Sequence, residues 1–291
     1  IIISINFYEW VNEKSYYEYT DWLINYQGGF TRRGLIGEIV FQIHDISLFR
    51  LDLILYFFVI SLYLIFFIFL NKILSKTELN FINSLILFSP LSFLYFAASK
   101  TMAGRKEILF FSLVVIFFYK FENIKFEYIK FWIIFILVIS TLSHLGFIFY
   151  IPFLILFSFF AYPNRKTSEY ISQLIPILIS GILIVAAISY TTIFSKPDIN
   201  LICDSIEKYT NNCPENTYLR VFTYSIDNIL NVNQILFQNN YLIKYPIYYF
   251  LSFFPIYYGL LNLNNNGNYK AKKLIYILVG CSILTIPVFL L

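Results

Sequence analysis

Long apolar stretches separated by short charged segments dominate this chain of 291 residues. Most of these stretches approach the ~20 residues that a helix needs to cross a bilayer. Hydrophobic residues make up 59% of the sequence and charged residues 13%, a balance too apolar for a soluble domain of this size. The sequence therefore predicts an all-α, polytopic transmembrane helical bundle with about eight spans. They are expected near 51–71, 81–98, 108–119, 129–142, 145–162, 171–194, 245–263 and 274–291.

The polar parts of the chain suggest how this bundle is organised. Residues 1–5 read as the last turn of a helix, so we expect a fragment with a truncated N-terminal transmembrane helix. We interpret 1–291 as a single transmembrane domain with two larger extracytoplasmic regions, 6–50 and 195–244. The first region is amphipathic and rich in aromatic side chains, Trp22 among them. Such side chains are expected at the lipid headgroup boundary.

The distribution of basic residues predicts the orientation. Four connecting loops contain ten of the 21 Lys and Arg residues but only four of the 17 acids. Basic loops are retained in the cytoplasm, so we expect a multi-pass protein of the bacterial inner membrane with these loops inside. The loops are 72–80, 120–130, 163–169 and 264–273.

The segment 108–119 is short for a crossing. We expect a true crossing by a helix that extends upstream through the polar stretch near Arg105. If this segment were re-entrant instead, every later loop would change sides.

Two adjacent arginines, Arg32 and Arg33, occur in the string GGFTRRGLIGE of the first outer region. Guanidinium groups bind phosphate in a bidentate manner, which favours a lipid diphosphate as ligand. Alternatively, the pair anchors to ordinary phospholipid headgroups or forms ion pairs with Asp21 and Glu38.

A second cluster of positive charge lies in SKTMAGRKEI, at residues 99–108. Lys100, Arg105 and Lys106 stand there on the side of the membrane where basic residues are disfavoured. In a helix Arg105 and Lys106 point in different directions, so at most one of these two need face a substrate. We assign Lys100 and Arg105 to diphosphate binding, with helix-end side chains reaching for the membrane surface as the alternative.

His144 and Asp21 are the candidate catalytic residues. His144 stands between two apolar runs, in STLSHLGFIFYIP, and a neutral imidazole there suits proton transfer. A histidine that caps a helix is the alternative interpretation. Asp21 is one of the acids nearest the arginine pair. His44, beside Asp45, is expected to be a solvated loop residue.

Cys203 and Cys213 lie in the second outer region, whereas Cys281 lies in the last apolar stretch. Two cysteines in an extracytoplasmic loop predict a Cys203–Cys213 disulfide. A metal site is not expected, because no histidine or third cysteine lies near them.

Two segments of the sequence, together with the arginine pair, resemble a known protein family. AGRKEILFFSLVVIFFY and SHLGFIFYIPFLIL, within 103–158, together with the pair at 32–33, resemble the O-antigen polymerase and EpsG-like polysaccharide polymerases. These enzymes belong to the wider GT-C group of membrane glycosyltransferases. The resemblance implies glycan transfer from an undecaprenyl-diphosphate carrier on the outer leaflet, with no soluble cofactor. No acidic motif of that group is matched here.

We therefore expect an integral-membrane glycan polymerase or glycosyltransferase. Its partners would be a polyprenyl-diphosphate-linked glycan and membrane lipid, and no feature indicates nucleic acid. A lipid-linked oligosaccharide flippase or small-solute transporter is the first alternative, although the apolar runs contain almost no charge at mid-depth. A non-catalytic subunit of a membrane complex is the second.

The charge distribution yields a topological prediction. Single cysteines introduced as Lys76→Cys and Asn266→Cys, in a background without Cys203 and Cys213, should resist an impermeant thiol reagent added from outside. Reaction of Asn266→Cys from outside would show that 108–119 does not cross the membrane.

Overall fold

The computed structural model describes residues 17–31, 33–75, 104–162, 165–193 and 197–209. Every regular element in these ranges is helical, as the apolar stretches predicted. The α-helices are α2 (Tyr17–Leu23), α3 (Leu35–Ser47), α4 (Leu51–Leu74), α8 (Glu107–Lys120), α9 (Ile129–Ser143), α10 (Ile151–Ala161), α11 (Thr167–Ile193) and α12 (Ile199–Glu207). Short 3-10 helices occur at η1 (Phe121–Asn123), η2 (Phe126–Tyr128) and η3 (Leu145–Tyr150).

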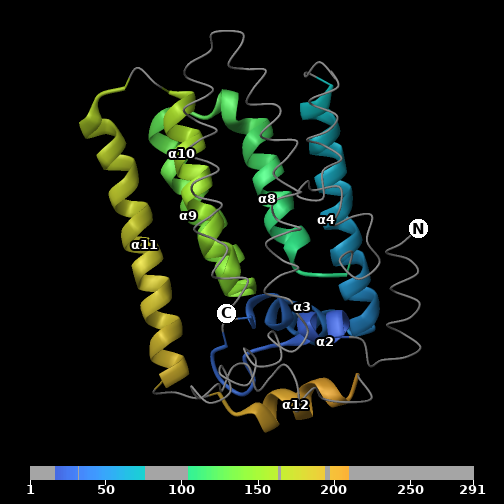
Figure 1. Ribbon diagram of the computed structural model, residues 1–291. Coiled ribbons are helices and arrows are strands. Elements are labelled where there is room, and N and C mark those ends of the chain that lie inside the picture. Colours follow the sequence, from blue (N-terminus) through green and yellow to red (C-terminus); the bar gives the residue numbers. More distant parts are fainter. Residues whose placement is uncertain (1–16, 32, 76–103, 163–164, 194–196, 210–291) are drawn as a thin grey trace, which may run out of the picture.

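The long helices stand side by side, whereas the short ones lie across one end. Figure 1 shows α4, α8, α9, α10 and α11 running between the same two ends of the molecule. Helices α2, α3 and α12 lie across the lower end in this view. The first turn of α8 and the junction of α9 with η3 reach the same end, so segments far apart in sequence meet there.

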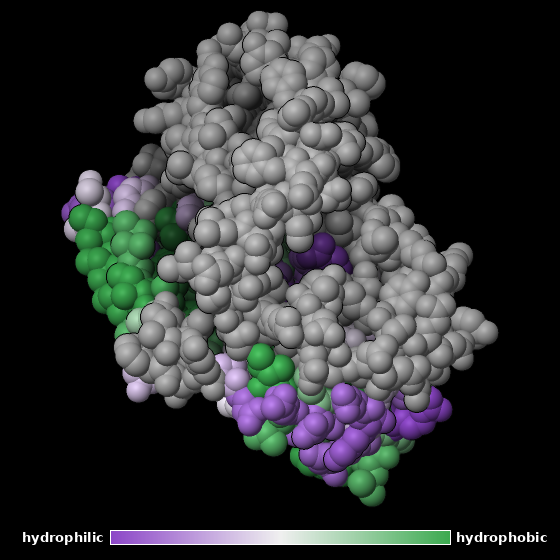
Figure 2. All heavy atoms as spheres, turned by 60° about the horizontal axis from the view of Figure 1, so that its bottom comes forward, coloured by the Kyte–Doolittle hydropathy of each residue, from purple (hydrophilic) through white to green (hydrophobic). Residues whose placement is uncertain are grey.

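Among the described residues, three helical segments are long and apolar enough to cross a membrane: Leu51–Leu74, Phe126–Ser143 and Thr167–Ile188. Their length and composition indicate a membrane protein, in agreement with the sequence. The outward side of α11 is apolar, and Figure 2 shows this green flank beside a more hydrophilic end near α12. The expected spans at 81–98, 245–263 and 274–291 lie outside the described residues.

Helix α8 begins later than expected. Its first residue is Glu107, with Lys106 at the N-cap, so the predicted upstream extension through Arg105 is wrong. The carbonyl of Gly104 accepts a hydrogen bond from Trp22 instead of a helical N–H. At ~1.5 Å per residue the 14 residues of α8 span about 21 Å, less than the ~30 Å of a bilayer core.

Polar side chains connect the long helices at two points. The Ser112 hydroxyl on α8 donates to the Leu62 carbonyl of α4 at 2.9 Å. The backbone N–H of Lys130 on α9 donates to Gln173 of α11 at 3.2 Å. Each bond satisfies a group that would otherwise be costly to hold in an apolar surrounding.

The helices across the end are packed into the protein. Trp22 on α2 is fully buried and contacts Phe58 edge to face, so its side chain packs against protein. Helix α3 approaches the preceding loop closely, because a Cβ built on Gly37 would lie 1.9 Å from the Ile24 carbonyl oxygen. Only a residue without a side chain permits this approach.

Helix α12 docks on the same region. The Asn25 side chain donates to the Ser205 hydroxyl at 2.8 Å, and the Asp198 N–H donates to the Gly28 carbonyl at 2.7 Å. His44 lies in the last turn of α3, and its Nε2 is 2.9 Å from the Tyr209 hydroxyl. The predicted loop position is therefore wrong, because His44 is helical, although the residue is partly exposed.

The close approach at Gly37 generates a stability prediction. Gly37→Ala should destabilise the protein by about 1–3 kcal/mol, because the added methyl group meets backbone that cannot move aside cheaply. Gly181→Ala on α11 is the matched control, since its Cβ would meet Leu137 at an ordinary 3.9 Å. Unfolding in detergent micelles measures both. Equal stability of the two variants would contradict the packing at Gly37.

Candidate functional site

A buried carboxylate organises the end of the molecule where the short helices lie. Asp21 sits on α2 and is 8% exposed. Its Oδ1 is 3.1 Å from Nη1 of Arg33, which donates a hydrogen bond to it. Its Oδ2 is 3.8 Å from Nζ of Lys106. Two cations from different segments therefore flank one carboxylate.

Lys106 is the most deeply placed of these charges. It occupies the N-cap position of α8, and its side chain is completely buried. Its ammonium donates to the Arg33 carbonyl at 2.9 Å, whereas the distance to Asp21 is too long for a direct hydrogen bond. In the described part of the chain, Nζ thus makes a single hydrogen bond and retains N–H groups for a further acceptor.

The pKa values of this pair reflect burial and mutual attraction. Burial lowers the pKa of Lys106 to about 8, even though Asp21 acts in the opposite direction. Burial alone would raise the pKa of Asp21, but Lys106 and Arg33 outweigh it and hold that pKa below its ordinary value. Asp21 is consequently ionised at neutral pH, and Lys106 is close to its titration range.

His144 contributes a neutral ring to the same cluster. Its backbone is extended, with φ −160° and ψ 112°, which ends α9 and starts η3. Nδ1 accepts a hydrogen bond from the Gly146 N–H at 3.2 Å, so the capping interpretation of this residue describes the structure. Burial, followed by the field of Arg33, lowers the pKa of the ring to about 3.

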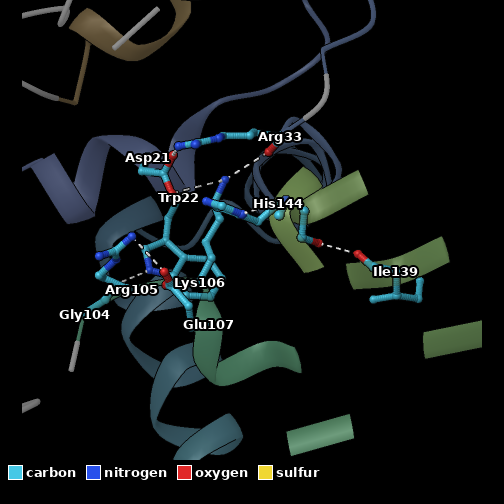
Figure 3. A network of polar contacts seen from close by, with 11 residues as sticks. Asp21, Trp22, Arg33, Gly104, Arg105, Lys106, Glu107, Ile139 and His144 are labelled. Carbon is cyan, nitrogen blue, oxygen red and sulfur yellow. Dashed lines mark hydrogen bonds and ion pairs between the residues drawn. The ribbon is translucent and has the colours of Figure 1, made fainter. Parts of the chain in front are cut away.

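Arg105 and Trp22 complete the surroundings. Arg105 pairs with Glu107 at 2.8 Å. The Trp22 indole N–H donates to the Gly104 carbonyl at 2.6 Å and fixes the chain just before these charges. Figure 3 shows the head groups of Asp21, Arg33 and Lys106 gathered together, with the His144 ring directed toward them.

The structure thus brings together Asp21, Arg33, Arg105 and His144, all of which the sequence nominated. Arg33 also forms the ion pair with Asp21 that was the alternative interpretation of the arginine pair. Arg32 and Lys100 lie outside the described residues. Cys203 is disulfide-bonded, but Cys213 lies outside the described residues, so this pairing remains a prediction.

Lys106 is the residue that the sequence interpretation did not select. Arg105 and Lys106 are adjacent, and which one faces inward depends on where α8 begins. A start at Glu107 leaves Lys106 at the cap, turned toward Asp21, whereas Arg105 is partly exposed. The signal available in the sequence was the charge of Asp21 in the first outer region, which requires a buried cation as partner.

The arrangement has the chemistry of an anion site. Arg33, Lys106 and the imidazole supply N–H donors, whereas Asp21 accepts a hydrogen bond from Arg33 and the Arg33 carbonyl accepts one from Lys106. Guanidinium and ammonium groups held close together favour an acceptor-rich anion such as phosphate. Within the described ranges, no group of three or more His, Cys, Asp or Glu residues is arranged to hold a metal ion.

Comparisons with known proteins do not assign this chain to a family. No protein-family model, curated protein or solved structure shows significant similarity to this chain. Functional inference therefore rests on the residues themselves.

The Asp21–Lys106 pair predicts energetic coupling. Lys106→Met should cost about 3 kcal/mol of unfolding free energy, because it leaves a buried carboxylate with less compensation. The double variant with Asp21→Asn should lose less than the sum of the single losses, by at least about 1 kcal/mol. Unfolding in mixed micelles measures the cycle.

The exposed pair Arg50–Asp52 provides the control for this cycle. Its variants Arg50→Met and Asp52→Asn should show little coupling, because water screens an exposed guanidinium. Strictly additive losses at Asp21 and Lys106 would argue against a functional ion pair.

Proposed function

We propose that this protein is an integral-membrane glycan polymerase or glycosyltransferase that uses a polyprenyl-diphosphate-linked sugar donor at the extracytoplasmic face of the bacterial inner membrane. The observation that carries the proposal is the cluster of buried Asp21 and Lys106 with partly buried Arg33 and His144 at one end of an apolar helical bundle. A lipid-linked diphosphate presents its charge at this depth while its hydrocarbon chain remains in the bilayer. The resemblance of segments 103–158 and 32–33 to polysaccharide polymerases supports the same chemistry.

The two cations suit the leaving group of such a reaction. Arg33 can offer paired N–H groups to two phosphate oxygens, and Lys106 adds a compact charge. Both are held in place before substrate arrives, Arg33 by Asp21 and Lys106 by the Arg33 carbonyl. Preorganised charge of this kind stabilises the negative charge that develops on a departing diphosphate.

Asp21 is the group that accepts the proton. In the transfer, the acceptor hydroxyl oxygen bonds to the anomeric carbon while the bond from that carbon to the diphosphate oxygen breaks. The diphosphate leaves with the electron pair, and the hydroxyl proton passes to the Asp21 carboxylate. A bound diphosphate competes for Arg33 and Lys106, which weakens their hold on Asp21 and raises its basicity. The base thus becomes effective when the donor is present.

The placement of charge favours surface chemistry over passage through the membrane. In the candidate spans Leu51–Leu74 and Thr167–Ile188, the charged residues are Asp52, Lys72 and Glu169, which all lie near helix ends. Transporters generally carry polar groups at mid-depth, where their substrates bind. Among the described residues, Lys106 and Arg33 instead lie beside the short helices at one end.

The fork geometry of Arg33 provides the test. Arg33→Lys should lower glycan transfer by about tenfold or more, because an ammonium retains the charge but not the paired N–H groups. Transfer is measured in proteoliposomes supplied with polyprenyl-diphosphate-linked glycan and an acceptor sugar. Arg50→Lys is the matched control, because Arg50 is exposed and pairs with Asp52 away from the cluster.

Each alternative function gives a different outcome of the assay. Transfer that is equal in Arg33→Lys and Arg50→Lys would leave the cluster with a structural role. Movement of labelled lipid-linked glycan across the bilayer without bond formation would identify a flippase. Absence of both activities, in protein that is folded, would identify a non-catalytic subunit.

A further inference from the structure

His144 has a hydrogen-bonding arrangement that restricts its chemistry. A neutral imidazole carries one proton, so one ring nitrogen donates and the other accepts. The backbone N–H of Gly146 can only donate, and it lies 3.2 Å from Nδ1. Nδ1 is therefore the acceptor, which leaves the proton of the neutral ring on Nε2.

The surroundings keep the ring neutral. Burial and the positive charges of Arg33, Lys106 and Arg105 disfavour the imidazolium, and Asp21 opposes them only in part. A general base at this position would need a lone pair at Nε2, and therefore a proton at Nδ1. That tautomer would bring the ring N–H against the Gly146 N–H and lose the cap of η3.

Nε2 faces a region that already holds donors. Figure 3 shows the ring directed toward Asp21, Arg33 and Lys106. Among the described residues, no acceptor is hydrogen-bonded to Nε2, and the only hydrogen bond of Lys106 Nζ goes to the Arg33 carbonyl. The described residues thus leave N–H groups of two separate segments, on Nε2 and Nζ, with capacity for a further hydrogen bond.

From this geometry we infer that His144 donates a hydrogen bond through Nε2–H to an anionic phosphate oxygen, and that Gly146 fixes the required tautomer. His144 is then a substrate-binding donor, and the proton of the acceptor hydroxyl goes elsewhere. This inference rests on the proposed function for the identity of the anion. It replaces the role of general base that the sequence suggested for this residue.

The two histidines of the chain make the tautomer directly measurable. In the 291-residue chain labelled with ¹⁵N-histidine, His44→Gln leaves the His144 ring as the single signal. We expect a protonated Nε2 and an unprotonated Nδ1, unchanged between about pH 5 and 8. Addition of polyprenyl diphosphate should shift Nε2 and its proton, whereas Nδ1 should move less. A proton on Nδ1, or an imidazolium above pH 6, would overturn the inference.

Different phosphate sources separate the possible ligands. A shift with polyprenyl diphosphate but not with inorganic pyrophosphate indicates a lipid-linked ligand. A shift with both indicates recognition of the phosphate groups alone, and the inference still holds. If glycan transfer is absent but the shift occurs, the proposed function fails and the donor role stands. A ring that no phosphate compound shifts would leave His144 as a helix cap only.

Two substitutions distinguish a donor from a base by binding and turnover. His144→Asn keeps an acceptor that can cap the Gly146 N–H but lacks a donor at the Nε2 position. His144→Gln places an amide N–H farther out and cannot act as a base. We expect about tenfold weaker binding of polyprenyl diphosphate by the Asn variant and substantially less weakening by the Gln variant. Unchanged binding with an equal collapse of turnover in both would support the base instead.

Discussion

The carboxylate of Asp21 can be buried only because two cations are brought to it. An uncompensated charge at this depth would be protonated or would destabilise the fold. Arg33 reaches it from the loop before α3, and Lys106 reaches it from the N-cap position of α8. The ion pairs therefore determine how α2 lies against the long helices. The same charges give this end of the bundle its chemical character.

The balance between these groups is sensitive to a ligand. Lys106 has a pKa of about 8 because burial opposes its charge, as does the charge of Arg33, while Asp21 and Glu107 support it. An added anion would support that charge further and at the same time compete for the cations near Asp21. Binding and proton affinity are thus coupled through direct electrostatics, without a large conformational change. Coupling between anion binding and proton affinity is expected of a functional cluster and not of a purely structural one.

The sequence predicted the long helices better than the contacts at their ends. The run 51–71 became α4 because about 20 apolar residues favour a single membrane helix. Asp21, Arg33 and His144 were recognised because charge or imidazole is costly near a membrane. Lys106 was missed, since the start of α8 depends on a tertiary bond from Trp22 to Gly104. The burial of Trp22 was missed for the same reason, because an aromatic residue suits both a headgroup boundary and a core.

The bond between Trp22 and Gly104 joins residues 82 positions apart in the chain. During synthesis, α2 therefore leaves the ribosome well before its partner, and α4 must be integrated between the two. Before Lys106 has been synthesised, Arg33 is the one of these two cations that can pair with Asp21. The nascent N-terminal region must remain hydrated or be sheltered by the insertion machinery during this interval. The order of translation thus makes α8 the element that brings Lys106 to a carboxylate synthesised long before it.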